Sequence, residues 1–543
     1  MKRTIVQTNP IDGQKPGTSG LRKKTHIFRG AHFLENYVQS IFDGIGGIVG
    51  KTLVVGGDGR FYNDRAIQTI LRMAAANGAA KCIVGQGGLL STPAASYIIR
   101  HYETDGGLIL SASHNPGGPD ADFGLKYNMP NGGPATEGVT DLIFECTQEI
   151  HKYFTVESAD YNLKTLGDGM IHDMVVTVID PIVDYANLMR ELFDFAAISE
   201  LFAGGFRMCF DAMHAVTGPY AHAILETQLG APHGTVINGT PSPNFGGGHP
   251  DPNPTWARQL MGIMMGDDAP DFGAASDGDG DRNMIVGRGV YVTPSDSLAV
   301  LAANAHLAPA YASGLAGVAR SMPTSRAVDR VATQMGLDCF ETPTGWKFFG
   351  NLLDSGNVTL CGEESAGTGS DHMREKDGLW AVLLWLNILA VTKQSVPEIL
   401  TRHWNTYGRN YYSRHDYEDV KTEDADLLIA ELRDRMDELV GQSFNGFNVV
   451  SADEFSYLDP VDNSLSKNQG VRINFEGGAR VVVRLSGTGT IGATIRIYLE
   501  RVETDKSQLQ QNAQDALAPL IDAAEQIICI NRYTGRACPD VIT

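Results

Sequence analysis

Short apolar stretches that end in glycine-rich or polar loops recur through most of the chain. The stretch KTLVVGGDGR (51–60) is typical of a buried strand that leaves through a glycine turn, and helical spacing follows from Asp64 to about Asn77, before a second strand. This order is that of a βαβ unit. Strand, turn and helix return in the same order at 206–225 and 317–336. The pattern thus predicts α/β units in series, each with loops at its strand ends, the usual ligand-binding edge of such sheets.

The pattern changes after about Arg402, where an aromatic and charged stretch replaces the βα units. The strands GVRINFEG, ARVVVRLSG and ATIRIYLE alternate apolar and polar residues, as in an antiparallel sheet with one covered face, and helical spacing runs from Ser507 to Ile527. We therefore predict an α/β protein: three consecutive α/β domains with mixed sheets around a central cleft, followed by a C-terminal α+β domain. The predicted domains are 1–190, 191–303, 304–405 and 406–543.

One apolar strand ends in a turn that presents a serine. Residues 107–118 read GLILSASHNPGG, which places Ser113 at the lip of a turn built from Asn, Pro and Gly. Such a serine can be a nucleophile. The same residues are also common in ordinary turns, where Asn and Ser side chains form hydrogen bonds with their own backbone. This stretch alone therefore leaves two interpretations open, a nucleophilic serine and an ordinary turn.

A second loop gathers carboxylates. In FGAASDGDGDRNMI (272–285), Asp277, Asp279 and Asp281 alternate with glycines after a small-residue strand. Carboxylates so close together repel one another unless a hard divalent cation takes their oxygens. An EF-hand is excluded because Arg282 stands where that loop needs glycine. A solvated acidic loop remains the alternative, but flanking apolar residues and glycines favour a metal site.

Charge and composition narrow the possible partners. The chain has 543 residues and a formal charge of -21, which argues against nucleic acid or an anionic membrane as partner. The apolar stretch LWAVLLWLNILAV (379–391) is too short to span a bilayer, which takes about 20 residues, so we predict a core helix. The first residues lack the apolar segment of a signal peptide, and seven cysteines without a Cys-x-x-Cys pair suit reduced thiols. We expect a cytoplasmic protein.

A third loop, RLSGTGT (484–490), is suited to an anion. It places small and hydroxyl residues on a strand-to-turn connection between two arginines. Backbone N–H groups and bidentate guanidinium groups are the usual cradle of a phosphate. The candidate phosphate-binding residues are Arg484, Ser486, Gly487, Thr488 and Arg496.

Four of these stretches together carry a resemblance to a known family. SASHNPGG, DGDGDRNMI, GEESAG (362–367) and RLSGTGT, in this order, resemble the four active-site loops of the α-D-phosphohexomutases, most of all those of the phosphoglucomutases. Three further stretches also resemble phosphoglucomutase segments: KPGTSGLRKK (15–24), PTGWKFFGNL (343–352) and REKDGLWAVL (374–383). The resemblance runs from about residue 10 to the last strands.

The resemblance implies a role for each matching residue. Ser113 is expected to carry the phosphoryl group that is passed on, and one Mg²⁺ is expected to be held by Ser113, Asp277, Asp279 and Asp281. Lys376 is expected to be the general acid/base, with His114 beside the serine as a hydrogen-bond partner. The remaining expected contacts to the sugar phosphate are Arg22, Arg282, Thr344, Glu363 and Ser365. Ala366 departs from the family, which commonly has an aromatic residue at this position.

The implied reaction is the interconversion of α-D-glucose 1-phosphate and glucose 6-phosphate through the phosphoserine and glucose 1,6-bisphosphate, which serves as activator and intermediate. The alternatives are a phosphomannomutase or phosphoglucosamine mutase, or a catalytically silent mutase-like scaffold protein. A serine hydrolase is disfavoured because Ser113 lacks the Gly-x-Ser-x-Gly turn. We expect small-molecule sugar phosphates as partners, no nucleic acid and no membrane, and a monomer or weak dimer. Substrate binding is expected to draw the C-terminal domain over the cleft and exclude water.

Overall fold

The computed structural model describes residues 3–486 and 492–543 and begins with a mixed sheet that carries the serine turn. Its strand order is β2-β6-β5-β3-β4-β9-β8, with β3, β4, β5 and β9 parallel and the outer strands antiparallel. The strands are β2 (Leu21–Lys24), β3 (Thr52–Gly57), β4 (Lys81–Leu89), β5 (Gly107–Leu110), β6 (Asp122–Asn128), β8 (Gly167–Ile171) and β9 (Met174–Ile179). Helices of this part are α1 (Thr25–Phe28), α2 (Phe33–Gly44), α3 (Asn63–Ala76), α4 (Thr92–His101) and α5 (Glu137–Glu149), and β1 (Arg3–Gln7) pairs with β7 (Lys152–Val156). The helix expected from Asp64 to about Asn77 is thus present as α3.

Two smaller mixed sheets follow, with orders β11-β10-β12-β13-β14 and β16-β15-β17-β18. The first comprises β10 (Met208–Asp211), β11 (Val236–Ile237), β12 (Phe272–Ser276), β13 (Asn283–Gly287) and β14 (Val290–Val292), with helices α6 (Pro181–Leu192), α7 (Phe195–Ala203), α8 (Thr217–Ala221) and α9 (Arg258–Met264). The second comprises β15 (Gly317–Ser321), β16 (Asp338–Thr342), β17 (Leu360–Gly362) and β18 (Thr368–Ser370), with helices α10 (Pro294–Asn304), α11 (Ala327–Met335), α12 (Lys347–Asp354), α13 (Gly378–Thr392) and α14 (Val396–Tyr407). Both repeat the strand–helix order that the sequence predicts.

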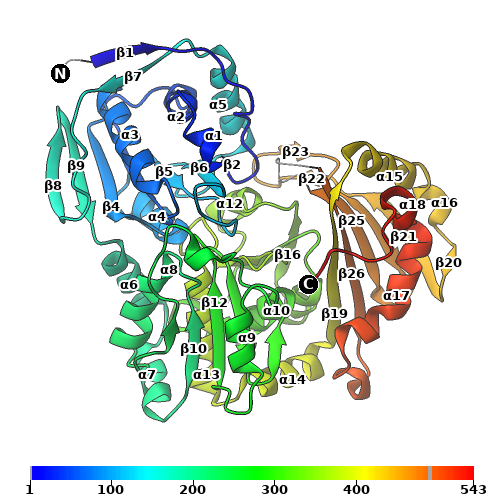
Figure 1. The fold of residues 1–543 in the computed structure, drawn as a ribbon. Helices are drawn as coiled ribbons and strands as arrows, with labels where there is room; N and C mark the ends of the chain where they lie inside the picture. Colours follow the sequence, from blue (N-terminus) through cyan, green and yellow to red (C-terminus); the bar gives the residue numbers. More distant parts are fainter. Residues whose placement is uncertain (1–2, 487–491) are drawn as a thin grey trace.

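The C-terminal part is an antiparallel sheet with helices on one side (Figure 1), in the order β20-β21-β24-β25-β26-β19-β27. Its strands are β19 (Arg409–Val420), β20 (Ser443–Phe444), β21 (Phe447–Glu454), β24 (Val471–Phe475), β25 (Arg480–Ser486), β26 (Ala493–Glu503) and β27 (Val541–Ile542). The helices are α15 (Thr422–Asp434), α16 (Met436–Leu439), α17 (Ala513–Ile528) and α18 (Ile530–Thr534), and β22 (Tyr457–Leu458) pairs with β23 (Leu465–Ser466). The predicted C-terminal α+β fold is confirmed.

Helix α13 lies at the centre of a continuous apolar core that the three α/β parts share. Residues 378–390 of this helix are all buried, and the cluster around them includes Ile98 of α4, Phe210 of β10 and Val331 of α11. A helix that is apolar on every side is stable only when it is covered on every side. The prediction of a core helix is therefore confirmed. The helix also ties the three parts together.

Two sequence expectations need adjustment at helix ends. The last long helix begins at Ala513 and not at Ser507, because the Asn512 side chain accepts hydrogen bonds from the backbone N–H groups of Gln514 and Asp515 and caps the helix there. The stretch near Arg402, where the composition changes, is still helical, since α14 continues to Tyr407. The domain boundaries themselves remain predictions.

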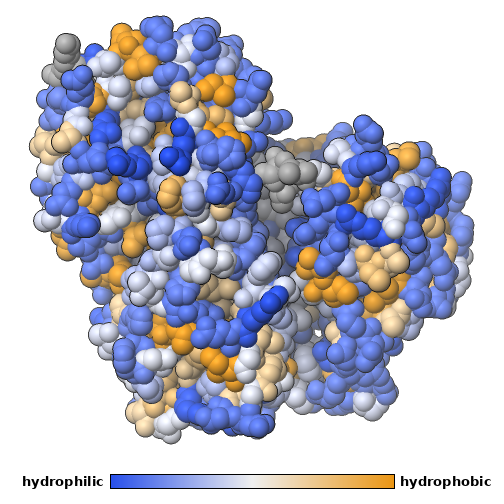
Figure 2. All heavy atoms as spheres, viewed as in Figure 1, coloured by the Kyte–Doolittle hydropathy of each residue, from blue (hydrophilic) through white to orange (hydrophobic). Residues whose placement is uncertain are grey.

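Hydrophilic residues dominate the face shown in Figure 2, and hydrophobic ones form small separate patches, with a furrow between the N-terminal and C-terminal parts. Of the helices in residues 3–486 and 492–543, none is both long and apolar enough to cross a membrane by itself. The pair α13 and α14 meets the length and composition requirement jointly, but it is bent by 86°.

Candidate active site

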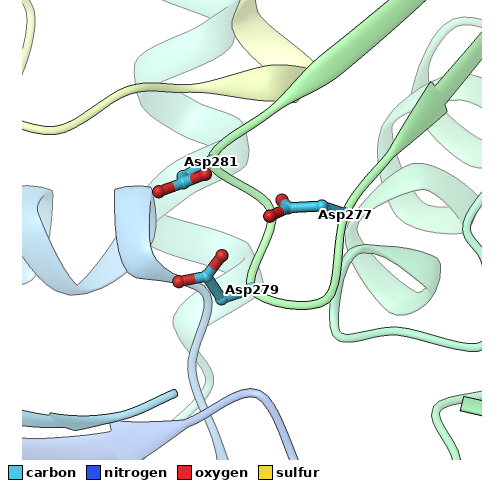
Figure 3. Close-up of side chains that lie close together, drawn as sticks. All are labelled: Asp277, Asp279 and Asp281. Carbon is cyan, nitrogen blue, oxygen red and sulfur yellow. The ribbon is translucent and has the colours of Figure 1, made fainter. Parts of the chain in front are cut away.

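The three aspartates lie on the turn between β12 and its antiparallel partner β13. All three are buried, and one oxygen from each lies within 4.8 Å of the others. Figure 3 shows the carboxylates of Asp277, Asp279 and Asp281 converging on a common space. Gly280 has a φ of +83°, so the turn needs a residue without a side chain at this position. The alternation of aspartate and glycine is what allows three side chains of one short loop to converge.

This carboxylate cluster fits a hard divalent cation. Oδ1 of Asp279 and Oδ1 of Asp281 are buried, and neither has a hydrogen-bond partner within residues 3–486 and 492–543. Burial, and then the charges of Asp281 and Asp279, raise the pKa of Asp277 well above its usual range. For Asp279, burial favours a higher pKa, but Lys126, a hydrogen bond from Thr92, Lys376 and Arg22 together lower the pKa to about 2. Carboxylate oxygens that converge in this way are the ligand set that Mg²⁺ and Ca²⁺ prefer.

The serine turn faces this cluster. Ser113 follows β5, is almost fully buried, and donates a hydrogen bond from Oγ to Oδ2 of Asp277 at 3.0 Å. Its backbone has a φ of +51°, which is uncommon for a residue other than glycine and is concentrated at functional sites. Residues far apart in the sequence thus meet because both loops leave the same edge of neighbouring sheets.

Arg60 holds the serine turn, and the sequence analysis missed it. Its side chain is fully buried against Asp58, and it donates hydrogen bonds to the carbonyl oxygens of Ser113 (2.7 Å) and Asp122 (3.0 Å). The available signal was the GGDGR loop after β3, because β3 lies beside β5 in parallel and its loop emerges at the same edge.

Lys376 reaches the same cluster from the segment before α13. Its Nζ is 3.2 Å from Oδ2 of Asp281 and 4.0 Å from Oε2 of Glu363, and the side chain is about nine-tenths buried. Lys126, also missed, lies beside this group and forms a buried ion pair of 3.2 Å with Glu375. Only its position in an otherwise buried strand, DFGLKYN, could have marked it.

Three basic side chains, those of His114, Arg22 and Arg282, lie near one another beside the serine turn. Nδ1 of His114 is 3.4 Å from Oγ of Ser113, and burial, followed by Arg282 and Arg22, lowers the pKa of His114 well below its usual range. Burial also lowers the pKa of Arg22, whose Nε has no hydrogen-bond partner among the described residues. The backbone N–H of Arg282 donates to Oδ1 of Asp277 at 3.1 Å. A neutral histidine between two arginines suits an anionic ligand.

The expected sugar contacts come together on two loops of the third sheet. Oε1 of Glu363 accepts a hydrogen bond from the N–H of Gly345 at 2.9 Å, so the two loops touch. Oγ1 of Thr344 is buried without a hydrogen-bond partner in the described residues, and Ser365 is half-buried two residues beyond Glu363. The carbonyl of Ala366, which has a φ of +70°, accepts a hydrogen bond from the N–H of Asn283. This bond joins the loop to β13 directly after residues 277–282, the turn with the three aspartates, which we call the metal loop for its proposed role.

The C-terminal sheet contributes the expected arginines on paired strands. Arg484 of β25 and Arg496 of β26 are register partners, and Ser486 ends β25. Gly487 and Thr488 lie outside the described residues. Arg414 of β19 was missed: it donates to Glu364 at 2.9 Å and to Asp416 at 3.0 Å. The arginine set is thereby linked to the loop that carries Glu363.

The comparisons with known proteins follow this division of the chain. Residues 13–154, 184–289 and 294–407 match the α/β/α domains I, II and III of phosphoglucomutase/phosphomannomutase, and residues 409–540 match the C-terminal domain of phosphoglucomutase-1. The phosphoglucomutase of Rhizobium radiobacter is 59% identical and covers 99% of both chains. The cytoplasmic phosphoglucomutase of Solanum tuberosum is 50% identical over 100% of this chain and 99% of its own. The open form of the Paramecium exocytosis-sensitive phosphoprotein parafusin, a phosphoglucomutase, superposes with a TM-score of 0.93 at 48% identity, covering 100% and 99% of the chains.

Proposed function

The chain belongs to the phosphoglucomutase/phosphomannomutase family of the α-D-phosphohexomutase superfamily, and we propose that it is a phosphoglucomutase. It interconverts α-D-glucose 1-phosphate and glucose 6-phosphate. The proposed route uses a phosphoserine and glucose 1,6-bisphosphate. The observation that carries this route is the 3.0 Å contact between Oγ of Ser113 and the buried carboxylate cluster.

The proposed reaction moves one phosphoryl group at a time. A free hydroxyl of the sugar phosphate attacks the phosphorus on Ser113, so that the bond from phosphorus to Oγ breaks, a bond to the sugar oxygen forms, and the bisphosphate results. The sugar then turns over and returns its other phosphoryl group to Oγ. Lys376 takes the proton of the attacking hydroxyl and gives it back in the second half. A bound Mg²⁺ would be held by Ser113, Asp277, Asp279 and Asp281 and would supply charge neutralisation.

The other residues bind and orient the sugar phosphate. We propose that Glu363 and Ser365 accept and donate hydrogen bonds to sugar hydroxyls, with Thr344 as a further contact. Arg22 and Arg282 face the transferred phosphoryl group. The phosphate that is not being transferred is bound by Arg484, Ser486, Gly487, Thr488 and Arg496. We add Arg414 to this set, because it connects the same sheet to the sugar loop, the loop that carries Glu363 and Ser365.

The proposal also covers the cellular location and the oligomeric state of the protein. A cytoplasmic location is supported by the names of several plant relatives, although two others are named chloroplastic. A monomer or weak dimer acting on small sugar phosphates is the proposed working state.

Activity measurements with matched variants test the function. We expect Mg²⁺-dependent conversion of glucose 1-phosphate, lost on addition of EDTA and lost in Ser113→Ala. The control is Ser158→Ala, because Ser158 is only half-buried and, among the described residues, its hydroxyl bonds only to the neighbouring carbonyl of Ala159. Full activity of Ser113→Ala contradicts the phosphoserine route, and equal or faster turnover of mannose 1-phosphate or glucosamine 1-phosphate overturns the preference for glucose.

A further inference from the structure

The segment that carries Lys376 is held where α13 begins. The N–H of Gly378 donates to the carbonyl of Gly280 in the metal loop at 3.0 Å, and the N–H of Asp377 donates to the carbonyl of Thr368 at 2.9 Å. Lys376 directly precedes these residues and contacts Asp281. Whatever fixes the first turn of α13 therefore also fixes Nζ of Lys376 against the metal loop.

Asp377 is the fully buried anchor of this turn. Its Oδ1 accepts hydrogen bonds from the N–H of Trp380 at 3.0 Å, as an N-cap, and from the hydroxyl of Tyr185 at 2.6 Å. Its Oδ2 lies 3.1 Å from Nε2 of His372, whose side chain is 1% exposed. One carboxylate thus joins the start of α13 to α6 and to His372.

His372 is the middle of a closed chain of buried polar groups. Its Nδ1 is 2.7 Å from Oγ of Ser370, which is 2.6 Å from the hydroxyl of Tyr311. That hydroxyl receives the indole N–H of Trp380 at 2.9 Å, and the His372 ring stacks on the Trp380 ring at 5.3 Å. The chain starts and ends in the first turn of α13.

The chemistry of the two ends fixes the direction of every hydrogen bond. Indole nitrogen only donates and a carboxylate only accepts. Tyr311 accepts from Trp380, so its single proton goes to Ser370, and the proton of Ser370 goes to Nδ1 of His372. Nε2 of His372 then carries the hydrogen that Asp377 accepts. The opposite tautomer brings Nε2 and the carboxylate together as two acceptors. It also leaves one buried hydroxyl proton, of Ser370 or Tyr311, without an acceptor in this chain, and an unsatisfied buried group costs about 1–3 kcal/mol.

We propose that His372 is a positioning residue: through this one-directional chain it orients Asp377 and keeps the start of α13, with Lys376, against the metal loop. The inference rests on the proposed role of Lys376 as general acid/base. A shift of about 1 Å in a reacting group is enough to lower a rate about a hundredfold, so loss of the chain reduces kcat while the sugar and phosphate contacts, and hence KM, stay in place.

The test compares variants of His372 with a variant of a buried histidine that does not belong to this hydrogen-bonded network. His372→Phe keeps the ring but removes both hydrogen bonds, and we expect kcat to fall about tenfold or more at unchanged KM. His372→Gln retains a donor near the position of Nε2 and is expected to restore part of the loss. The control is His403→Phe in α14. His403 is buried beside Tyr407, and its Nδ1 has no hydrogen-bond partner among the described residues, so it takes no part in this hydrogen-bonded network.

A spectroscopic measurement tests the direction of these hydrogen bonds independently of enzyme activity. Nitrogen-15 spectra of selectively labelled wild-type protein, assigned with His372→Gln, are expected to show His372 with hydrogen on Nε2 and a bare Nδ1. Hydrogen on Nδ1, or kcat of folded His372→Phe within about twofold of wild type, overturns the inference. Should His372→Phe not fold, Ser370→Ala decides, because it keeps the histidine but removes its donor: a several-fold lower kcat supports the chain and an unchanged one contradicts it.

Lys376→Met separates this inference from the proposed function. If Lys376→Met keeps its kcat, the proposed role of Lys376 fails. If Lys376→Met loses activity while His372→Phe does not, only the positioning role of His372 fails.

Discussion

Three buried carboxylates beside a serine hydroxyl are electrostatically unfavourable without a cation. Burial, and then the neighbouring charges of Asp281 and Asp279, raise the pKa of Asp277, so the empty site retains a proton there more readily than an exposed aspartate does. A metal ion must displace that proton to bind. The three aspartates are therefore a proposed set of metal ligands that also competes for a proton.

This competition predicts that Mg²⁺ affinity weakens as the pH falls. Below the raised pKa of Asp277 each bound ion releases a proton, so the apparent affinity is expected to drop by up to about tenfold per pH unit. Calorimetry on protein without phosphate on Ser113, at about pH 8 and about pH 6, measures it. Asp277→Asn is expected to bind more weakly with a shallower pH dependence, and a wild-type affinity that is independent of pH contradicts the prediction.

At the scale of elements, the start of α13 lies directly against the metal loop. A Cβ on Gly378 would lie 2.0 Å from the carbonyl oxygen of Arg282 and 2.9 Å from Oγ of Ser276. Because the clashing atom belongs to the backbone, an added Cβ would force either the start of α13 or the metal loop to shift. The glycine is required by this close approach, and its φ is not in the positive range.

Gly378→Ala is therefore expected to lower stability by about 1–3 kcal/mol and kcat by about tenfold or more. Gly350→Ala in α12 is the matched control, because a Cβ there meets nothing within 4 Å and alanine favours the helix. Thermal unfolding and steady-state kinetics of both variants measure the difference. Wild-type kcat in Gly378→Ala would show that the position of α13 does not set the geometry of Lys376.

Elements with a strong local pattern could be predicted from the sequence, and contacts between elements could not. The spacing around Asp64 and the wholly apolar stretch of α13 predict helices that the structure contains. The Asp-Gly alternation predicts the carboxylate cluster, because one short loop carries all of its members. The sequence did not predict the roles of four residues, Arg60, Lys126, Arg414 and His372. Each of them contacts residues that are distant in sequence, and neither periodicity nor composition indicates such a contact.

At the scale of the whole molecule, the arginines proposed to bind phosphate lie on the C-terminal sheet, which is separate from the sheet that carries the three aspartates. Arg414, from β19, pairs with Glu364 beside the sugar loop, so the C-terminal sheet already touches the third α/β part. Nε of Arg496 is 3.6 Å from Asp416 and has no hydrogen-bond partner among the described residues. Such an arginine can turn to an arriving phosphate without losing a strong internal bond.

Arg496→Ala is expected to raise KM for glucose 1-phosphate about tenfold or more, since a charge-assisted pair contributes about 1.5–3 kcal/mol. Arg501→Ala is the control on the same strand, because Arg501 pairs with Glu503 at 3.3 Å and has no proposed contact with substrate. Steady-state kinetics separates the two. An unchanged KM in Arg496→Ala would remove this arginine from the phosphate site.

The central claim is that Ser113 carries the phosphoryl group that the sugar receives. Mass spectrometry of the protein after incubation with glucose 1,6-bisphosphate and Mg²⁺, followed by peptide mapping, tests it most directly. We predict one added phosphoryl group, on the peptide that contains Ser113, which disappears when glucose 1-phosphate is in excess and never forms in Ser113→Ala. An active wild-type enzyme whose Ser113 stays unmodified throughout turnover would contradict the claim.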